Sequence, residues 1–211
     1  MSASLRPRTR VTVTAFRDFL HVRGNPSEAL LTALQMQTPE ANEGWAFRLL
    51  DTVYADVEAN LLAVLSDPPD LLLMTGYSAQ ARGLKLETGA SDLMSPKFAD
   101  AAGHVPGPAA GTGTRIENER IDFAALRARL GEAGVAHHAS GDAGEFVCNH
   151  LYYRALRLIA RQDAATTALF VHVPAIAGTT LEESSASAMT LEEMVRGVRA
   201  VAAALSTASA M

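Results

Sequence analysis

A single cysteine is the residue of this sequence best suited to covalent chemistry. Cys148 is the one cysteine among 211 residues and lies in the stretch SGDAGEFVCNHLYY. Asp142 suits a helix N-cap and Glu145 follows three residues later, so we expect a helix from about Ala143 with Cys148 in its second turn. The amino-terminal half of a helix carries positive potential, which predicts a lowered thiol pKa. The plainer interpretation is that the thiol fills space in the core.

A histidine and a glutamate could complete a nucleophile–base–acid set with this cysteine. His172 lies inside the apolar run LFVHVP, near the carboxyl end of a predicted strand. It could reach a helix start that packs on the sheet edge, although a lone histidine in such a run is more commonly a core residue. Glu87, in GLKLETG, could orient the imidazole, although alone it suggests an ordinary surface residue.

These side chains need a scaffold, and the sequence indicates an α/β fold. Short β-branched or apolar runs alternate with segments of helical spacing, which predicts a mostly parallel mixed sheet in a three-layer α/β/α sandwich. We expect one domain over residues 1–211. In such sheets the site lies beyond the carboxyl ends of the strands. The expected strands are 11–16, 71–76 and 168–174, with a possible one in VAHHAS; the expected helices follow Asn25 and span 51–66, 123–134, 143–161 and the segment after Thr190.

The segment from Tyr77 to Arg120 fits neither pattern. It is rich in Gly, Pro, Ser and Ala, and its hydrophobic periodicity is poor. We expect it to be largely irregular, and long irregular segments in compact domains are often functional or contain short elements.

Composition narrows the class of protein. Apolar residues make up 48% and charged residues 19%, with a formal net charge of −5. This balance argues against nucleic acid or an anionic membrane as a partner, because both require clustered cations. The chain has neither a CxxC pair nor a Cys/His cluster, so we expect no metal and no cofactor. It has neither a signal peptide pattern nor an apolar run of about 20 residues, which predicts a cytoplasmic protein.

Four segments, taken in order, resemble the pyroglutamyl peptidase I family, also called the pyrrolidone-carboxylate peptidases. The segment GDAGEFVCNHLYY is close to the family's AGxFxCNxxxY around its nucleophile and is the most specific of the four. The other three gain weight from their combination and order along residues 11–174. They are VTAFRDF followed by NPSEAL, then MTGYSAQARGLKLET, and finally LFVHVP.

The resemblance implies a Cys148–His172–Glu87 triad and removal of an N-terminal pyroglutamyl residue from small peptides through a thioester. It implies that the Arg82 side chain and the Cys148 main-chain N–H stabilise the oxyanion. Phe16 and Phe19 match aromatic positions that line the family's pyroglutamate pocket, and an apolar pocket suits an uncharged lactam. We also expect a homo-oligomer, either a dimer or a tetramer.

The loop after the first predicted strand departs from the family pattern. Ala15, Arg17, Asp18 and Leu20 replace the family's glycine, glutamate, proline and glycine in AFRDFLHVRG. This change predicts a reshaped pocket and weak turnover of pyroglutamyl amides. One alternative is an amidohydrolase of the same fold with a different small acyl substrate. Another is a binding or assembly module in which Cys148 is structural.

Overall fold

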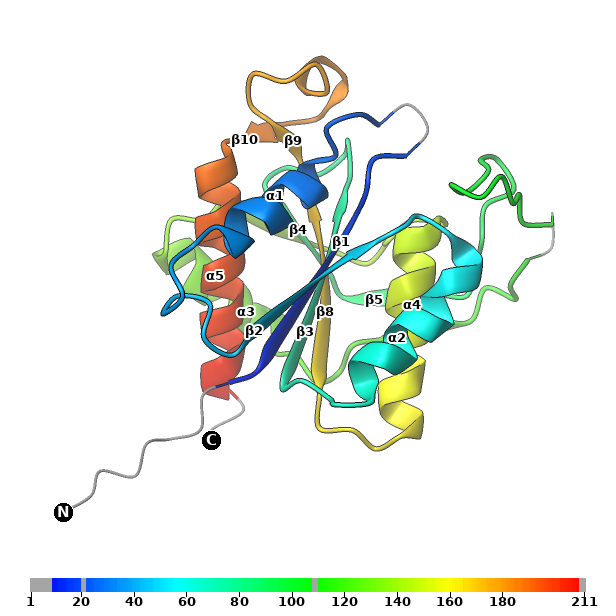
Figure 1. Cartoon of the computed structure of the whole chain (residues 1–211), viewed down its shortest axis with the longest axis horizontal. Coiled ribbons are helices and arrows are strands. Elements are labelled where there is room, and N and C mark those ends of the chain that lie inside the picture. The colour runs from blue at the N-terminus through cyan, green and yellow to red at the C-terminus, as the bar shows by residue number, and fades with distance from the viewer. Residues whose placement is uncertain (1–8, 20–21, 108–109, 209–211) are drawn as a thin grey trace.

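A six-stranded sheet forms the centre of the molecule (Figure 1). The computed structural model describes residues 9–19, 22–107 and 110–208. The strand order is β2-β1-β3-β8-β4-β7; the four strands from β2 to β8 are parallel, and β4 runs antiparallel to β8. These strands are β1 (Val11–Phe16), β2 (Trp45–Leu50), β3 (Leu71–Tyr77), β4 (Leu84–Glu87), β7 (His137–Ser140) and β8 (Thr167–Val173).

Helices cover both faces of this sheet. Figure 1 shows α1, α3 and α5 on one side and α2 and α4 on the other. The helices are α1 (Pro26–Gln35), α2 (Val57–Leu65), α3 (Phe123–Glu132), α4 (Val147–Arg161) and α5 (Leu191–Ala208). Two small two-stranded sheets complete the described part, one of β5 (Gly89–Ser91) and β6 (Arg115–Glu117), the other of β9 (Ala175–Ile176) and β10 (Ala188–Met189).

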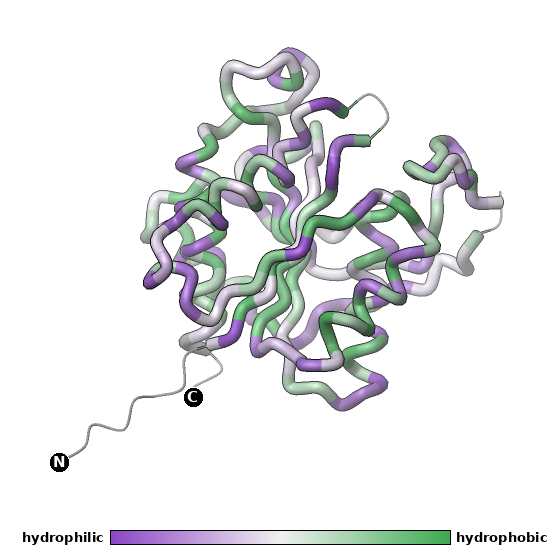
Figure 2. Tube along the Cα trace, viewed as in Figure 1, coloured by the Kyte–Doolittle hydropathy of each residue, from purple (hydrophilic) through white to green (hydrophobic). Residues whose placement is uncertain are grey.

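Each face of the sheet has its own hydrophobic core. Figure 2 shows hydrophobic residues concentrated along the central strands. Alternate strand residues supply the two cores, because successive side chains of a strand point to opposite faces. On β8, Leu169 and Val171 pack toward α5, whereas Ala168 and Phe170 pack toward α4. His172 continues the second series, so the strand's alternation directs it to the face that carries α4.

The expected α/β/α sandwich is confirmed, and several local signals act as predicted. The three predicted strands at 11–16, 71–76 and 168–174 lie side by side in one sheet and pair in parallel. The Asn25 side chain accepts a hydrogen bond from the Ser27 N–H, which caps α1, and Pro26 occupies the first turn. Thr190 and Glu193 form the reciprocal bonds of a capping box before α5.

The segment from Tyr77 to Arg120 contains three short strands, β4, β5 and β6, and is otherwise largely without regular structure, in line with its poor periodicity. The bounds expected for two helices were wrong. The helix expected at 143–161 begins only at Val147, because a turn closed by the Asp142 side chain and the Gly144 N–H precedes it. The helix expected at 51–66 is preceded by a 3₁₀ turn over Tyr54–Asp56 and spans only Val57–Leu65. Sequence reasoning also missed the edge strand β2, whose residues are mostly half-exposed.

Within the described ranges 9–19, 22–107 and 110–208, every helix is too short or too polar to cross a membrane.

Candidate active site

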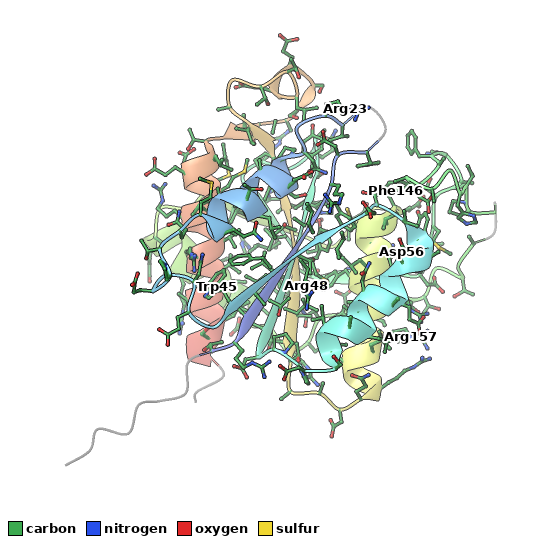
Figure 3. All side chains as sticks on the ribbon, viewed as in Figure 1. Arg23, Trp45, Arg48, Asp56, Phe146 and Arg157 are labelled. Atoms are coloured by element: carbon green, nitrogen blue, oxygen red, sulfur yellow. The ribbon has the colours of Figure 1, made fainter. Side chains whose placement is uncertain are left out.

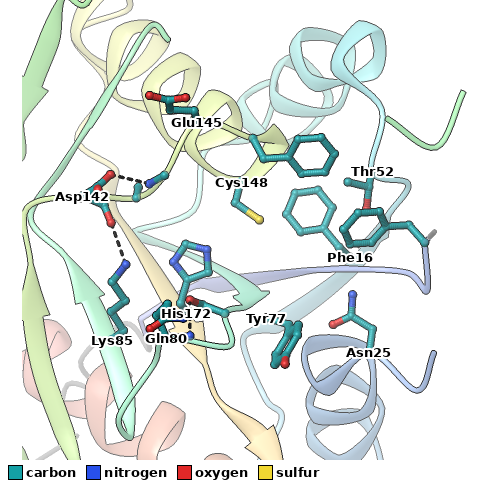
Figure 4. Close-up of a pocket in the computed structure, with 15 residues that line it drawn as sticks. Phe16, Asn25, Thr52, Tyr77, Gln80, Lys85, Asp142, Glu145, Cys148 and His172 are labelled. Carbon is teal, nitrogen blue, oxygen red and sulfur yellow. Dashed lines mark hydrogen bonds between the residues drawn. The ribbon is translucent and has the colours of Figure 1, made fainter. Parts of the chain in front are cut away.

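A cavity of about 310 Å³ opens at the carboxyl ends of β1, β3 and β8. Cys148 and His172 both line it, together with residues of the loop that leads into α4 (Figure 4). This is the edge of the sheet at which parallel α/β proteins place their ligands. The start of α4 lies at this edge, because Phe146, directly before the helix, lines the cavity, and Figure 3 shows Arg157 farther along α4, away from it.

His172 and Glu87 form a buried pair. The Nδ1 atom of His172 lies 2.7 Å from the Oε1 atom of Glu87, and the glutamate is fully buried. With the proton on Nδ1, the imidazole donates to the carboxylate and leaves Nε2 as a free base. The sequence indicated an exposed glutamate. Instead Glu87 lies behind the histidine and does not line the cavity, so the carboxylate can contact the imidazole but not a substrate.

Gly76 on β3 allows the nucleophile to reach this pair. It is the register partner of His172 on the neighbouring strand. A Cβ atom at position 76 would lie only 2.9 Å from the Sγ atom of Cys148. The sulfur therefore lies over Gly76. Because neighbouring strands are about 4.8 Å apart and His172 is the partner of Gly76 on the next strand, the thiol lies beside the histidine. Figure 4 shows the sulfur and the imidazole ring next to each other and facing the same space.

The thiol is neutral at rest, contrary to the lowered pKa expected from the helix end. Burial and, to a lesser degree, the negative charge of Glu87 raise the pKa of Cys148 to about 12, against smaller opposing effects of the cysteine's own N–H and of Lys85. Cys148 is half-buried, and this removal from water disfavours the charged thiolate. Because α4 begins at Val147, Cys148 lies in its first turn. Even there, the rise in thiol pKa caused by desolvation is larger than the lowering expected from the positive end of the helix.

The loop before α4 is fixed from two sides. The main-chain carbonyl of Glu145 accepts a hydrogen bond of 2.6 Å from the Ser95 N–H and one of 3.3 Å from the Tyr54 hydroxyl. The Tyr54 ring also packs edge-on against Phe146. As the second residue of α4, Cys148 has a main-chain N–H without an acceptor in its own helix. This N–H is therefore available to an oxyanion that forms near the sulfur.

An aromatic wall lies beside the nucleophile. Phe16, Phe19 and Phe146 line the cavity, and the rings of Phe19 and Phe146 stack with centroids 5.6 Å apart. Two polar groups are set into this wall. Thr52 is buried and its Oγ1 atom has no hydrogen-bond partner among the described residues, and Asn25 is buried at the start of α1.

The changed loop after β1 is closed by its own side chain. Asp18 accepts hydrogen bonds from the N–H groups of Gly24 and Asn25, at 3.0 and 2.7 Å. These contacts hold the pKa of Asp18 below its usual range. Asp18 therefore ties the segment after β1 to the start of α1, and Phe16 and Phe19 both line the cavity. Leu20, another changed position, lies outside the described residues.

Arg82 does not join the site. Its residue is exposed and lies outside the residues that line the cavity. The main-chain carbonyl of Arg82 contacts the His138 ring at 3.1 Å. The role expected for its guanidinium at the oxyanion is therefore not supported, because β4 and the turn before it direct this residue to the surface.

Sequence reasoning missed four residues of the site. They are Thr52, Phe146, Gly76 and Lys85. Lys85 had a readable signal, since it lies two residues before Glu87 and therefore shares its face on a strand. Thr52 and Phe146 lie in loops whose course the sequence pattern does not determine. Within the described part of the chain, no three His, Cys, Asp or Glu side chains gather in a way that could hold a metal ion.

The fold and the cavity define an α/β protein with a candidate site of the nucleophile–base–acid kind. Comparison with known proteins specifies the family. A family model described as pyroglutamyl peptidase matches residues 9–208. The chain belongs to the pyroglutamyl peptidase family.

Individual relatives agree with this assignment. The chain is 30% identical to the pyrrolidone-carboxylate peptidase of Vibrio vulnificus (strain YJ016), over 90% of this chain and 89% of the relative. It is also 30% identical to that of Streptomyces coelicolor, over 93% and 91%. The crystal structure of pyroglutamyl peptidase I from Bacillus amyloliquefaciens superposes with a TM-score of 0.79 at 22% identity, covering 94% of this chain and 95% of that one. At that identity the superposition supports the fold.

Proposed function

We propose that the protein is a cysteine exopeptidase that removes an N-terminal pyroglutamyl residue from small peptides. The observation that carries this proposal is the buried 2.7 Å contact between His172 and Glu87, at a cavity that also contains the Cys148 thiol. Family membership supports the same activity. A buried acid, a base and a thiol in this order are the parts that acyl transfer requires.

The neutral resting thiol determines how the reaction begins. Because burial raises the pKa of Cys148 to about 12, the sulfur of the free enzyme is a thiol and not a thiolate. His172 then acts as a general base. Its Nε2 atom takes the thiol proton as the sulfur attacks the scissile carbonyl carbon, and Glu87 keeps the ring in the required tautomer and orientation.

The remaining steps follow the acyl-transfer scheme. The carbonyl oxygen becomes an oxyanion that the Cys148 N–H can stabilise. The intermediate collapses when the carbon–nitrogen bond breaks and the imidazolium gives its proton to the leaving amine, which leaves a thioester on the sulfur. A water molecule, deprotonated by His172, attacks the thioester carbonyl and releases pyroglutamate. The thiolate regains its proton from the imidazolium.

The aromatic wall favours an uncharged acyl group. A lactam ring can stack against Phe19 and Phe146, and its polar edge can meet the Thr52 hydroxyl, which has no hydrogen-bond partner within residues 9–19, 22–107 and 110–208. A free α-ammonium in the same place would lose its hydration against three phenyl rings, which is costly without a counter-charge. The wall therefore supports pyroglutamyl over glutaminyl or glutamyl amino termini.

The test is hydrolysis of a chromogenic pyroglutamyl amide beside the matching glutaminyl amide. We expect turnover of the first compound only, and loss of turnover in both Cys148→Ser and His172→Ala. His137→Ala serves as the histidine control and should retain activity, because this residue pairs with the core residue Leu84 and lies outside the residues that line the cavity. Absence of wild-type turnover on the pyroglutamyl amide would contradict the proposed substrate. Activity that persists in Cys148→Ser would contradict the proposed nucleophile.

A further inference from the structure

Lys85 is an unusual residue for this chain. The sequence contains sixteen arginines and only two lysines, Lys85 and Lys97. Lys97 is exposed, whereas Lys85 lines the cavity from β4. Lys85 shares a strand face with Glu87, two residues on, and is the antiparallel register partner of His172. The strand pairing alone therefore brings its ammonium to the histidine–glutamate pair.

The contacts of Lys85 connect it to two parts of the site. Its Nζ atom lies 3.1 Å from Oε1 of Glu87, the same oxygen that contacts His172 at 2.7 Å. It also donates a hydrogen bond of 2.7 Å to the main-chain carbonyl of Asp142, in the loop before α4. The lysine side chain is only 15% exposed. In the described part of the chain the second carboxylate oxygen, Oε2, is buried without a hydrogen-bond partner, so the polar contacts that the structure shows for this side chain are made by Oε1.

This arrangement has an electrostatic consequence for the imidazole. A fully buried carboxylate strongly favours a positive charge beside it, and a histidine in contact with it alone would be drawn toward imidazolium. The ammonium of Lys85 offsets that charge and repels a second cation at the same oxygen. An imidazolium cannot accept the thiol proton, so a base that stays neutral is what the proposed first step needs.

We propose that Lys85 is a positioning residue, whose ammonium holds Glu87 and offsets its charge so that His172 remains a neutral imidazole. The catalytic consequence rests on the proposed function, whereas the effect on the imidazole does not. Other ionisable groups near the pair come from each element packed around it. They are Cys148 and Tyr152 on α4, Tyr77 on β3, His138 on β7 beside Lys85, and Asp142 and Glu145 in the loop.

The experiment follows the histidine directly. The ring carbons of the full-length protein's histidines are labelled with ¹³C and titrated by NMR, and the His172 signal is assigned by its loss in His172→Ala. In Lys85→Met we expect the His172 titration midpoint to rise by about one pH unit, a tenfold gain in proton affinity. Lys85→Arg keeps the charge and should keep the midpoint within roughly 0.2 units. The exposed Lys97→Met is the matched control and should behave as the wild type.

Kinetics gives an independent measure. If the wild type hydrolyses the pyroglutamyl amide, the acidic limb of its kcat/KM profile should move to higher pH in Lys85→Met by the same amount as the NMR midpoint. Lys85→Arg should restore it. A titration shift without any wild-type turnover would contradict the proposed function and leave the role of Lys85 standing.

A folded Lys85→Met protein whose His172 midpoint equals that of the wild type would overturn the inference. If the KM of that variant is also raised, and only for leaving groups that bear a carboxylate, Lys85 is a substrate contact instead. Should Lys85→Met not fold by circular dichroism, Lys85→Gln carries the same prediction, because it keeps a donor for Asp142 and removes the charge.

Discussion

Replacing Gly76 with alanine should disable the site while leaving the fold in place. The glycine lies on β3 opposite His172, and the Sγ atom of Cys148 rests directly over it. An added Cβ would stand 2.9 Å from this sulfur and 3.0 Å from the Cζ atom of Phe170. Phe170 is fully buried under α4, so its ring has little room to move. The sulfur must therefore retreat, and its retreat is away from the sheet that carries the base.

The magnitude follows from the contact distance. Optimal contacts between non-bonded carbon atoms lie at about 3.5–4.0 Å, so relief of a 2.9 Å contact needs a shift of roughly 0.6–1.1 Å. Misplacement of a reacting group by about 1 Å can lower the rate by about 100-fold. Overpacking a filled core costs about 1–3 kcal/mol of unfolding free energy. We therefore expect Gly76→Ala to be folded, less stable, and about 100-fold lower in kcat.

Steady-state hydrolysis of the pyroglutamyl amide and thermal unfolding test this pair of effects. Gly131→Ala is the matched control, because an added Cβ at this helical glycine meets nothing within 4 Å. It should keep kcat and gain slight stability, since alanine is the better helix former. Gly76→Ala with wild-type kcat would refute the view that the nucleophile depends on this close approach. Equal kcat losses in both variants would show that the assay reports general destabilisation.

Further expectations follow from the same site. Glu87→Gln should lower kcat by at least about 100-fold with little change in KM, measured by the same assay, because an amide can hold the ring in the wrong tautomer; an equal fall in kcat for Glu119→Gln, an exposed control, would count against this. Asp18→Ala should raise KM about tenfold and spare kcat, because the loop that presents Phe19 and Asn25 loses two hydrogen bonds. An unchanged KM would show that the loop closes without Asp18. The thiol should also make the fold less stable in alkali. Its pKa is raised from about 9 when unfolded to about 12 when folded, so its contribution is complete below pH 9 and is lost as pH rises toward 12, at about 1.4 kcal/mol per pH unit. Urea unfolding at pH 8 and 10 should show this loss in the wild type but not in Cys148→Ala; the buried Tyr152, whose pKa is also raised, contributes equally to both proteins. The same slope in both proteins would contradict a buried neutral thiol.

The three-layer fold could be predicted from the sequence because most of its strands and helices have recognisable local sequence patterns. The run from Leu71 to Gly76 and the run around His172 are apolar on both faces, as central parallel strands must be. The start of the helix after Asn25 is marked by an N-cap residue followed by a proline. β2 at the sheet edge lacks such a signal, because one of its faces meets solvent and its pattern is mixed. β4 is four residues long, too short for its alternation to stand out.

The sequence could indicate which residues form the candidate site, but not the burial and charge environment of those residues. Family resemblance named Cys148, His172 and Glu87, and the alternation of β8 accounts for the direction of the histidine. The position of the carboxylate relative to solvent depends on pairing between strands far apart in sequence, so an acid expected at the surface is fully buried. The thiol pKa shows the same dependence, because the local helix start predicts a lowered value whereas the surrounding core raises it.

The antiparallel direction of β4 relative to β8 explains why Lys85 lines the cavity whereas Glu87 is buried behind His172. If β4 ran parallel to β8, its carboxyl end would reach the same sheet edge as His172, and an acid there would face the cavity. Because β4 is antiparallel, it starts at that edge and runs inward, so Lys85 pairs with His172 and Glu87 lies one step deeper. The acid is thereby kept from substrate and water while the lysine stays at the cavity wall. The order of lysine and glutamate along β4 thus determines which charge meets the solvent and which one orients the base.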